Sequence, residues 1–171
     1  MKNYFAHKTA EISSSANIGK NTKIWHYCHI RENARIGENC NVGRNVYVDF
    51  GVIIGNNCKI QNNCSIYHGV TIENGVFIGP HVVFANDKIP RAITPEGKTK
   101  TNDDWIAGKI RVNQGTSIGA HSVILPNVII GKFAMIGAGS IVTKDVPDFA
   151  LVFGNPAKII GTVDKRGYRV K

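Results

Sequence analysis

The sequence predicts an all-β protein, built as a parallel β-helix with one inserted loop. The first observation is an aliphatic residue at every sixth position over most of the chain. The second is a single interruption of this spacing, from about residue 85 to residue 111. A six-residue period cannot stay on one face of an α-helix, whose period is 3.6 residues, whereas short strands joined by tight turns can repeat in this way.

The repeat defines where the coils lie. We expect three hexapeptides to close one triangular coil, with the aliphatic residue in the interior and each coil paired to the next at about 4.8 Å. Residues 12–84 and 112–147 are therefore predicted to be coils, and residues 85–111 to be an active-site loop. Before the loop the aliphatic positions are Ile12, Ile18, Ile24, Ile30, Ile36, Val42, Val48, Ile54, Ile60, Ile66, Ile72, Ile78 and Phe84. After it they are Val112, Ile118, Ile124, Ile130, Ile136 and Val142.

The two ends of the chain do not follow the repeat. Residues 1–11 are predicted to be an N-terminal cap and residues 148–171 a short C-terminal cap, because a solenoid needs covered ends. All of these segments belong to a single predicted domain, residues 1–171.

Composition narrows the possible partners. The 21 Lys and Arg exceed the 12 Asp and Glu, which gives a net charge of +9 and suits a ligand that carries phosphates. There is no block of consecutive basic residues, so no nucleic-acid partner is expected. No apolar run is long enough for a membrane span, and no signal core follows Met1, so a cytoplasmic location is expected.

All four cysteines occupy the small interior position of the repeat. They are Cys28, Cys40, Cys58 and Cys64. This placement predicts buried thiols rather than metal ligands, nucleophiles or disulfides.

Several segments carry a resemblance to a known family. They are Ile24-Trp25-His26, Ile66-Tyr67-His68-Gly69, Val83-Phe84-Ala85-Asn86-Asp87 and Gly154-Asn155-Pro156. The chain resembles the left-handed β-helix acyltransferases of hexapeptide repeats. Among these it is similar to nucleotide-sugar 3-N-acetyltransferases, which act on UDP-2-acetamido-3-amino-2,3-dideoxyglucuronate or on dTDP-3-amino-3,6-dideoxyhexoses. The resemblance implies a left-handed coil, acetyl-CoA as co-substrate, a nucleotide-linked amino sugar as acceptor, and a homotrimer with sites between subunits.

The start of the loop favours N-acetylation over O-acetylation. A hydroxyl needs a base, yet residues 84–87 contain no histidine. Asn86 cannot act as a base, but its side-chain oxygen can accept a hydrogen bond from an amine, and the resemblance implies this contact. His68 and Asn86 each stand two residues after an interior position, one coil apart, so we expect them on neighbouring rungs. The hypothesis is that Asn86 orients the amine while His68 accepts its proton or steers the substrate.

Further residues are candidates for binding. In the glucuronate branch Glu is expected at the position of His68, so the sequence leaves UDP or dTDP, and a sugar carboxylate, undecided. The predicted substrate contacts are Asp87, Arg91, Tyr67, Arg31 and Lys59. The predicted contacts to acetyl-CoA, which follow from the resemblance and from the positive charge of the tail, are Gly119, Gly137, Ala138, Lys158 and Arg166.

Three alternatives stay open. One is an O-acetyltransferase in which His68 is the base. Another is a β-helix carbonic anhydrase, whose zinc needs three histidines; His26 and His29 are three apart and no His-x4-His exists, so no metal is expected. The last is a non-catalytic scaffold, which has no reason to interrupt its own repeat.

Overall fold

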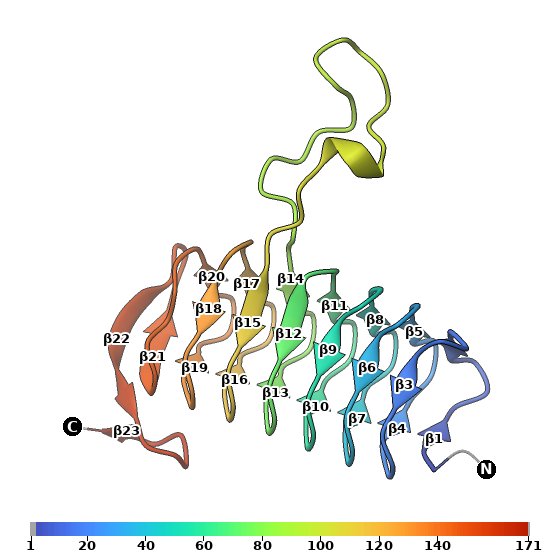
Figure 1. Ribbon diagram of the computed structural model, residues 1–171. Helices are drawn as coiled ribbons and strands as arrows, with labels where there is room; N and C mark the ends of the chain where they lie inside the picture. Colours follow the sequence, from blue (N-terminus) through green and yellow to red (C-terminus); the bar gives the residue numbers. More distant parts are fainter. Residues whose placement is uncertain (1–2, 171) are drawn as a thin grey trace.

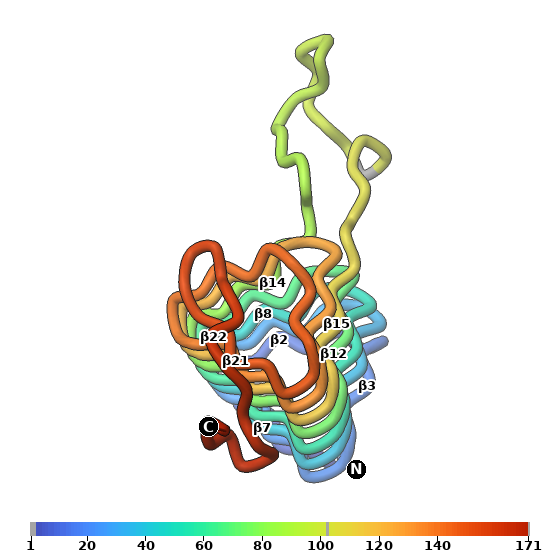
Figure 2. The backbone as a smooth tube through the Cα atoms, turned by 90° about the vertical axis from the view of Figure 1, so that its left-hand side faces the viewer, coloured from blue at the N-terminus to red at the C-terminus, as the bar shows by residue number. Residues whose placement is uncertain are grey.

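The computed structural model describes residues 3–170 and has the form of a triangular prism of stacked coils, from one edge of which a long loop rises (Figure 1). Seen from its end, the prism has coils that lie one behind another around a common interior (Figure 2). Three sheets, which we call A, B and C, form the faces of the prism. The fold is therefore the predicted parallel β-helix, consistent with the left-handed form.

The chain visits the three sheets in turn. Sheet A holds β1 (Phe5–Ala6), β4 (Lys23–Ile24), β7 (Asn41–Val42), β10 (Lys59–Ile60), β13 (Phe77–Ile78), β16 (Ser117–Ile118), β19 (Met135–Ile136), β21 (Ala150–Phe153), β22 (Lys158–Val163) and β23 (Arg169–Val170). Sheet B holds β2 (Glu11–Ile12), β5 (His29–Ile30), β8 (Tyr47–Val48), β11 (Ser65–Ile66), β14 (Val83–Phe84), β17 (Val123–Ile124) and β20 (Ile141–Val142). Sheet C holds β3 (Asn17–Ile18), β6 (Arg35–Ile36), β9 (Ile53–Ile54), β12 (Val70–Ile72), β15 (Ile110–Val112) and β18 (Ile129–Ile130).

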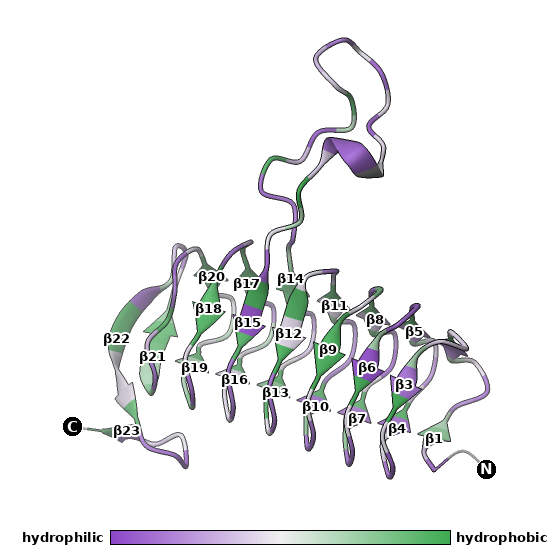
Figure 3. Cartoon of the chain, viewed as in Figure 1, coloured by the Kyte–Doolittle hydropathy of each residue, from purple (hydrophilic) through white to green (hydrophobic). Residues whose placement is uncertain are grey.

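The interior is formed by the second residue of most strands. Neighbouring coils pair these residues directly, as Ile24 with Val42 and Ile66 with Phe84. In Figure 3 most strands have the colour of hydrophobic residues, whereas many of the turns between them have the colour of hydrophilic residues. Burial of these aliphatic side chains is the main source of stability for such a stack.

The cysteines are buried and free, as predicted. Their thiols contact carbonyl oxygens of the next coil, for example Cys28 Sγ to Gly43 O at 2.9 Å and Cys64 Sγ to Gly79 O at 3.1 Å. Burial raises the pKa of the Cys64 thiol to about 11, so it is a poor nucleophile.

The prism extends further in both directions than the repeat indicated. β1 already pairs in parallel with β4, and β21 pairs in parallel with β19, so coils begin within residues 1–11 and continue past residue 147. Ala6 takes an interior position, but it is not a large aliphatic residue, so the search for aliphatic residues at every sixth position did not include it. After β21 the chain turns back, and β22 and β23 add antiparallel strands to sheet A.

The inserted loop leaves and re-enters at one corner of the prism. It follows β14 of sheet B and leads into β15 of sheet C, so the chain resumes on the next face in order. The two ends of the loop lie side by side. Gly108 N donates to Asn86 O at 2.7 Å, and Asp87 and Ala107 form an isolated antiparallel β-bridge. The loop carries one short 3-10 helix, η1 (Asn102–Asp104). Nothing helical within residues 3–170 has the length and apolar character to cross a membrane.

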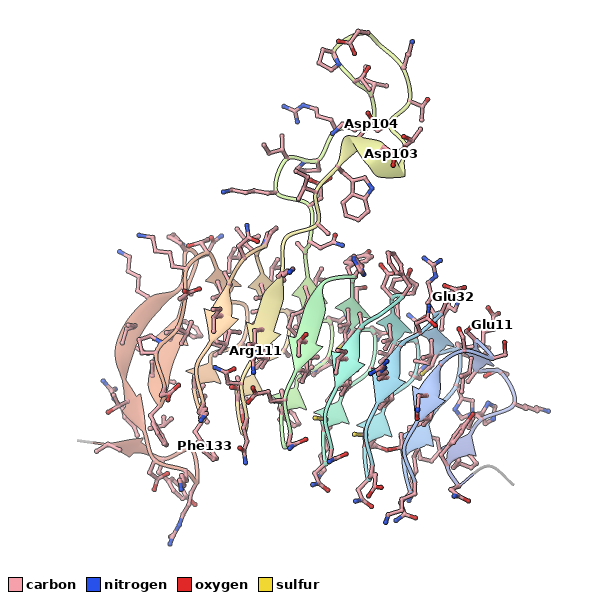
Figure 4. All side chains as sticks on the ribbon, viewed as in Figure 1. Glu11, Glu32, Asp103, Asp104, Arg111 and Phe133 are labelled. Carbon is pink, nitrogen blue, oxygen red and sulfur yellow. The ribbon has the colours of Figure 1, made fainter. Side chains whose placement is uncertain are left out.

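One ion pair ties the coil before the loop to the coil after it. Glu73 accepts hydrogen bonds from the Arg111 guanidinium and from Gln114 N, the latter at 3.0 Å. Figure 4 labels Arg111 on β15. The bond to Arg111 lowers the pKa of Glu73 below its usual range, with a smaller lowering from Gln114. The carboxylate therefore stabilises the folded state wherever it is ionised.

We predict that Glu73→Gln lowers the free energy of unfolding by about 1 kcal/mol at neutral pH. Because the folded pKa is the lower one, this contribution is complete above the unfolded pKa and is lost as the pH falls through the folded pKa. The difference between wild type and variant should therefore shrink below about pH 4.5. Denaturant unfolding at several pH values measures it. Glu38→Gln, in an exposed pair with Lys20, is the control and should change little; an equal loss at all pH values would contradict the linkage.

Candidate active site

The three corners of the prism differ in the residue that comes directly after the interior residue. After sheets A and C this position is often glycine, because a Cβ has no room against the next coil. On Gly119 it would lie 2.4 Å from Ala138 N, and on Gly37 it would lie 2.7 Å from Gly55 C. After sheet B there is no glycine at this position. The corner between sheets B and C is thus free to carry large side chains.

That corner, which we call the B–C edge, carries polar and aromatic residues on successive coils. Figure 4 shows Glu32 on the same edge from which the loop rises. In order along the edge, the residues are Arg31 and Glu32, then Asp49 and Phe50, then Tyr67 and His68, then Asn86. The B–C edge therefore carries charged, polar or aromatic side chains on four successive coils.

Asn86 stands at the base of the loop, just after β14. Its Nδ2 donates to the carbonyl oxygen of His68 at 3.1 Å. The main-chain carbonyl oxygen of Asn86 accepts from Gly108 N, so the residue is also held by the returning end of the loop. The side-chain Oδ1 has no protein partner within the described residues and is the atom left to accept a hydrogen bond. The predicted neighbouring of His68 and Asn86 follows from the observed pairing of β11 with β14.

His68 is half-buried one coil below Asn86. Its Nδ1 lies 3.0 Å from the carbonyl oxygen of Phe50. A carbonyl can only accept, so Nδ1 carries a proton, and in the neutral imidazole the lone pair is then on Nε2. The ring stacks on Phe50, with centroids 4.0 Å apart and planes at 12°. Phe50, His68, Trp105 and Ala107 line a cavity of about 270 Å³, so two residues of the loop face the same space as the imidazole.

The base of the loop holds two of the predicted substrate contacts. Asn86, Asp87 and Arg91 line one cavity of about 300 Å³ with Trp105 and Lys100. Asp87 Oδ1 accepts from Ile89 N at 2.9 Å, and Arg91 Nη1 donates to Pro90 O at 3.0 Å. Lys100 is a second cation beside Asn86 that sequence reasoning missed, because nothing periodic marks positions in the loop.

Asp49 is a further residue that sequence reasoning missed. It is only 7% exposed. Its Oδ1 accepts from Arg31 at 3.1 Å, from Tyr47 at 3.0 Å and from Phe50 N at 2.8 Å. Its Oδ2 accepts from His68 N at 3.1 Å. A signal was present: Asp49-Phe50 stands one coil before Tyr67-His68, at the same register.

The remaining predicted substrate contacts separate into two groups. Arg31 lies on the B–C edge, but its guanidinium already pairs with Asp49 and, at 3.0 Å, with Glu32. Tyr67 is exposed on the same edge. Lys59 lies on β10 of sheet A and is exposed there, so a single chain does not bring it to Asn86.

The predicted acetyl-CoA contacts lie at the far end of sheet A. Gly119, Gly137 and Ala138 follow β16 and β19 at the corner between sheets A and B, and Lys158 pairs with Phe153 beside them. Arg166 instead lies across the sheet, in a small cavity with Phe133 and Met135. Figure 4 labels Phe133 at the lower corner, away from the loop.

The histidines outside the edge make ring contacts with neighbouring aromatic side chains. His26 stacks on His7 at 3.5 Å, and His29 meets Tyr47 edge-on at 5.6 Å. No group of metal-binding side chains occurs within the part of the chain that the structure describes. The B–C edge itself offers hydrogen-bond acceptors and the imidazole of His68.

The family is established by sequence comparison. The model of the bacterial transferase hexapeptide (six repeats) matches residues 15–49, 51–86 and 109–144, well over half of the chain. The model of the hexapeptide repeat of succinyl-transferase matches residues 33–68. The chain belongs to the hexapeptide-repeat transferase family.

Individual relatives match over shorter stretches. A dTDP-3-amino-3,6-dideoxy-alpha-D-galactopyranose 3-N-acetyltransferase of Aneurinibacillus thermoaerophilus is 59% identical over 56 residues, which is 33% of this chain and 29% of that protein. The putative acetyltransferase YvoF of Bacillus subtilis is 47% identical over 68 residues, 40% of each chain. The chain thus spans less than half the length of these relatives.

Solved structures share the fold over nearly the whole chain. AntD, an N-acyltransferase from Bacillus cereus in complex with dTDP and 3-hydroxybutyryl-CoA, superposes with a TM-score of 0.65 at 23% identity, over 96% of this chain and 82% of that one. PerB from Caulobacter crescentus, in complex with CoA and GDP-perosamine, has a TM-score of 0.54 at 21% identity, over 93% and 58%.

We predict that Gly119→Ala lowers the free energy of unfolding by about 1–3 kcal/mol, because the new Cβ would meet the backbone of the next coil. Gly37→Ala, at the corner between sheets C and A and also crowded by the backbone of the next coil, is the matched variant and should cost a similar amount. Thermal unfolding measures both. A stable Gly119→Ala with only a raised KM for acetyl-CoA would contradict this explanation and assign the glycine to ligand binding.

Proposed function

We propose that this chain is an acetyl-CoA-dependent N-acetyltransferase that acts on the 3-amino group of a nucleotide-linked 3-amino-3-deoxy sugar. The observation that carries the proposal is the pair of free acceptors at the base of the loop. Asn86 is anchored through Nδ2, which leaves Oδ1 to accept from an amine. His68 is anchored through Nδ1, which leaves Nε2 as a base one rung below.

The reaction needs only positioning and one proton acceptor. A neutral amine is nucleophilic, so its nitrogen attacks the thioester carbonyl of acetyl-CoA directly. The C–N bond forms, the C–S bond breaks, and coenzyme A leaves as thiolate. Asn86 Oδ1 orients the amine, and its surplus proton passes to His68 Nε2. Backbone N–H groups stabilise the oxyanion. No cysteine is placed to form an acyl-enzyme, since all four are buried.

In this proposal the amino sugar and acetyl-CoA bind at two different regions of the chain. The sugar amine belongs at the B–C edge, and Asp87, Arg91 and Lys100 offer contacts to the rest of the acceptor. Acetyl-CoA belongs at the corner of Gly119, Gly137 and Ala138, with exposed Lys158 available to a phosphate. These regions lie on different corners of one prism. A homotrimer with sites between subunits, in which a neighbour supplies the second corner, is part of the same proposal.

The comparisons support the substrate class. The relative from Aneurinibacillus is named as a 3-N-acetyltransferase of a dTDP-linked 3-amino sugar. A structure of a single-residue variant of AntD, 25% identical to this chain with a TM-score of 0.60, holds dTDP-4-amino-4,6-dideoxyglucose and coenzyme A. A cytoplasmic location, where both co-substrates would be met, belongs to the proposal as well.

O-acetylation is the second candidate, because the free Nε2 of His68 suits the activation of a hydroxyl. A panel of acceptors separates the two. With acetyl-CoA and UDP- or dTDP-linked sugars, we expect thiol release with 3-amino sugars and none with their 3-hydroxy counterparts. The preferred nucleotide identifies the branch of the family. Equal turnover of both kinds of sugar, or turnover of the 3-hydroxy sugar alone, would favour the O-acetyltransferase; no turnover in the whole panel would overturn the proposal.

We predict that Asn86→Ala lowers kcat/KM for the amino sugar by about tenfold to a hundredfold, because the amine loses the group that orients it. Asn17→Ala, an exposed position on sheet C, is the control and should leave the rate unchanged. Steady-state kinetics with the best acceptor of the panel measure the effect. A rate within twofold of wild type would remove Asn86 from the mechanism.

A further inference from the structure

We propose that Asp49 is a positioning residue that holds His68 in the orientation and tautomer used for the reaction. This inference rests on the proposed function, since it concerns the same site. Asp49 lies one coil below His68 and does not contact the imidazole. It acts through the main chain of two coils and through Phe50.

One carboxylate binds the peptide N–H groups of both coils. Asp49 Oδ2 accepts from His68 N at 3.1 Å, on the upper coil. Asp49 Oδ1 accepts from Phe50 N at 2.8 Å, on its own coil. Each oxygen therefore fixes the backbone on one side of the imidazole.

Phe50 carries this constraint to the imidazole ring. Its carbonyl accepts the Nδ1 proton of His68 at 3.0 Å, which leaves Nε2 as the basic nitrogen. Its phenyl ring stacks on the imidazole at 4.0 Å. The Phe50 carbonyl belongs to the Phe50–Gly51 peptide, whose N–H donates to Glu32 O at 2.9 Å, and Asp49 holds the preceding peptide through Phe50 N. A shift of the Phe50 main chain would weaken the bond from its carbonyl to His68. With the Phe50 carbonyl turned away, Nε2 could take the proton instead, and the base would be lost.

The surroundings of Asp49 require a carboxylate rather than an amide. Four donors meet its two oxygens, with Arg31 and Tyr47 in addition to the two peptide groups. Burial raises the pKa of Tyr47, and its bond to Asp49 adds to the increase, so the phenol stays protonated and donates. An amide has one acceptor oxygen, and its NH2 group would face either His68 N–H or the other donors.

The coil itself does not require an acidic residue at this place. The same position on other coils of sheet B holds Tyr67 one coil above and Leu125 after the loop. At the corners after sheets A and C it is often glycine. The fold therefore does not require the carboxylate of Asp49, which occurs on the coil that pairs with the one carrying His68.

Asp49→Asn tests the inference, with Glu32→Gln as the matched control. The Glu32 carboxylate also pairs with Arg31, so its variant removes one negative charge beside the same guanidinium. The Glu32 side chain has no bond to Phe50 or His68 within the described residues, and the variant keeps the main-chain bond from Gly51 N to Glu32 O. We expect Asp49→Asn to lower kcat by about tenfold or more while KM for acetyl-CoA changes less than about threefold. Glu32→Gln should keep kcat within about twofold. Equal losses in both variants, or none in Asp49→Asn, would overturn the inference.

A second readout separates positioning from folding and from the proposed function. Nitrogen NMR shifts of the His68 imidazole, measured without substrate, should report protonated Nδ1 in wild type and a mixture of tautomers in Asp49→Asn. If that variant does not fold, Tyr47→Phe removes one donor from the same oxygen and should lower kcat without changing the fold. An unchanged tautomer would overturn the inference even if the enzyme acetylates amino sugars. A changed tautomer in a chain that acetylates none would overturn the proposed function instead.

Discussion

The constant register between stacked coils is the constraint on which the rest of the structure depends. Each interior residue pairs with the equivalent residue of the next coil, as Ile66 does with Phe84. A slip by one residue would turn every interior side chain to the surface, so burial fixes the register strongly. The same pairing places His68 below Asn86 and Asp49 below both. The geometry of the candidate site is thus a consequence of how the core is filled.

The inserted loop leaves this register intact because it begins and ends at one corner. The coils on either side pair with each other as if the insertion were absent: Val83 pairs with Val123, and Ile72 pairs with Val112. The insertion therefore lies at an edge where the scaffold loses no strand pairing. The hydrogen bond between Gly108 and Asn86 closes the loop base beside the predicted amine contact. Because this hydrogen bond holds both the loop base and the main chain of Asn86, we expect a change that opens the loop base to move Asn86 as well.

The six-residue repeat predicts the features that depend on spacing, but it does not predict which side-chain and main-chain atoms form hydrogen bonds. It placed the coils, the loop and the pair His68 and Asn86, since each is a matter of position within the repeat. It could not show that Asp49 holds His68, because spacing says which residues are neighbours and not which atoms bond. Ala6 was missed as an interior residue because alanine is too small to mark the repeat. The sequence did not predict the course of residues 85–109, since the loop has no period and rises away from the prism (Figure 1).

In the proposed reaction, the anchored side chains of Asn86 and His68 at the B–C edge leave two acceptors for an amine. A crystal structure of the protein with coenzyme A and a nucleotide-linked 3-amino sugar tests it most directly. We predict that the amine nitrogen lies within about 3.2 Å of Asn86 Oδ1, on the side that faces His68 Nε2. An amine bound at another corner of the prism, with the Asn86 side chain turned away from the sugar, would contradict it.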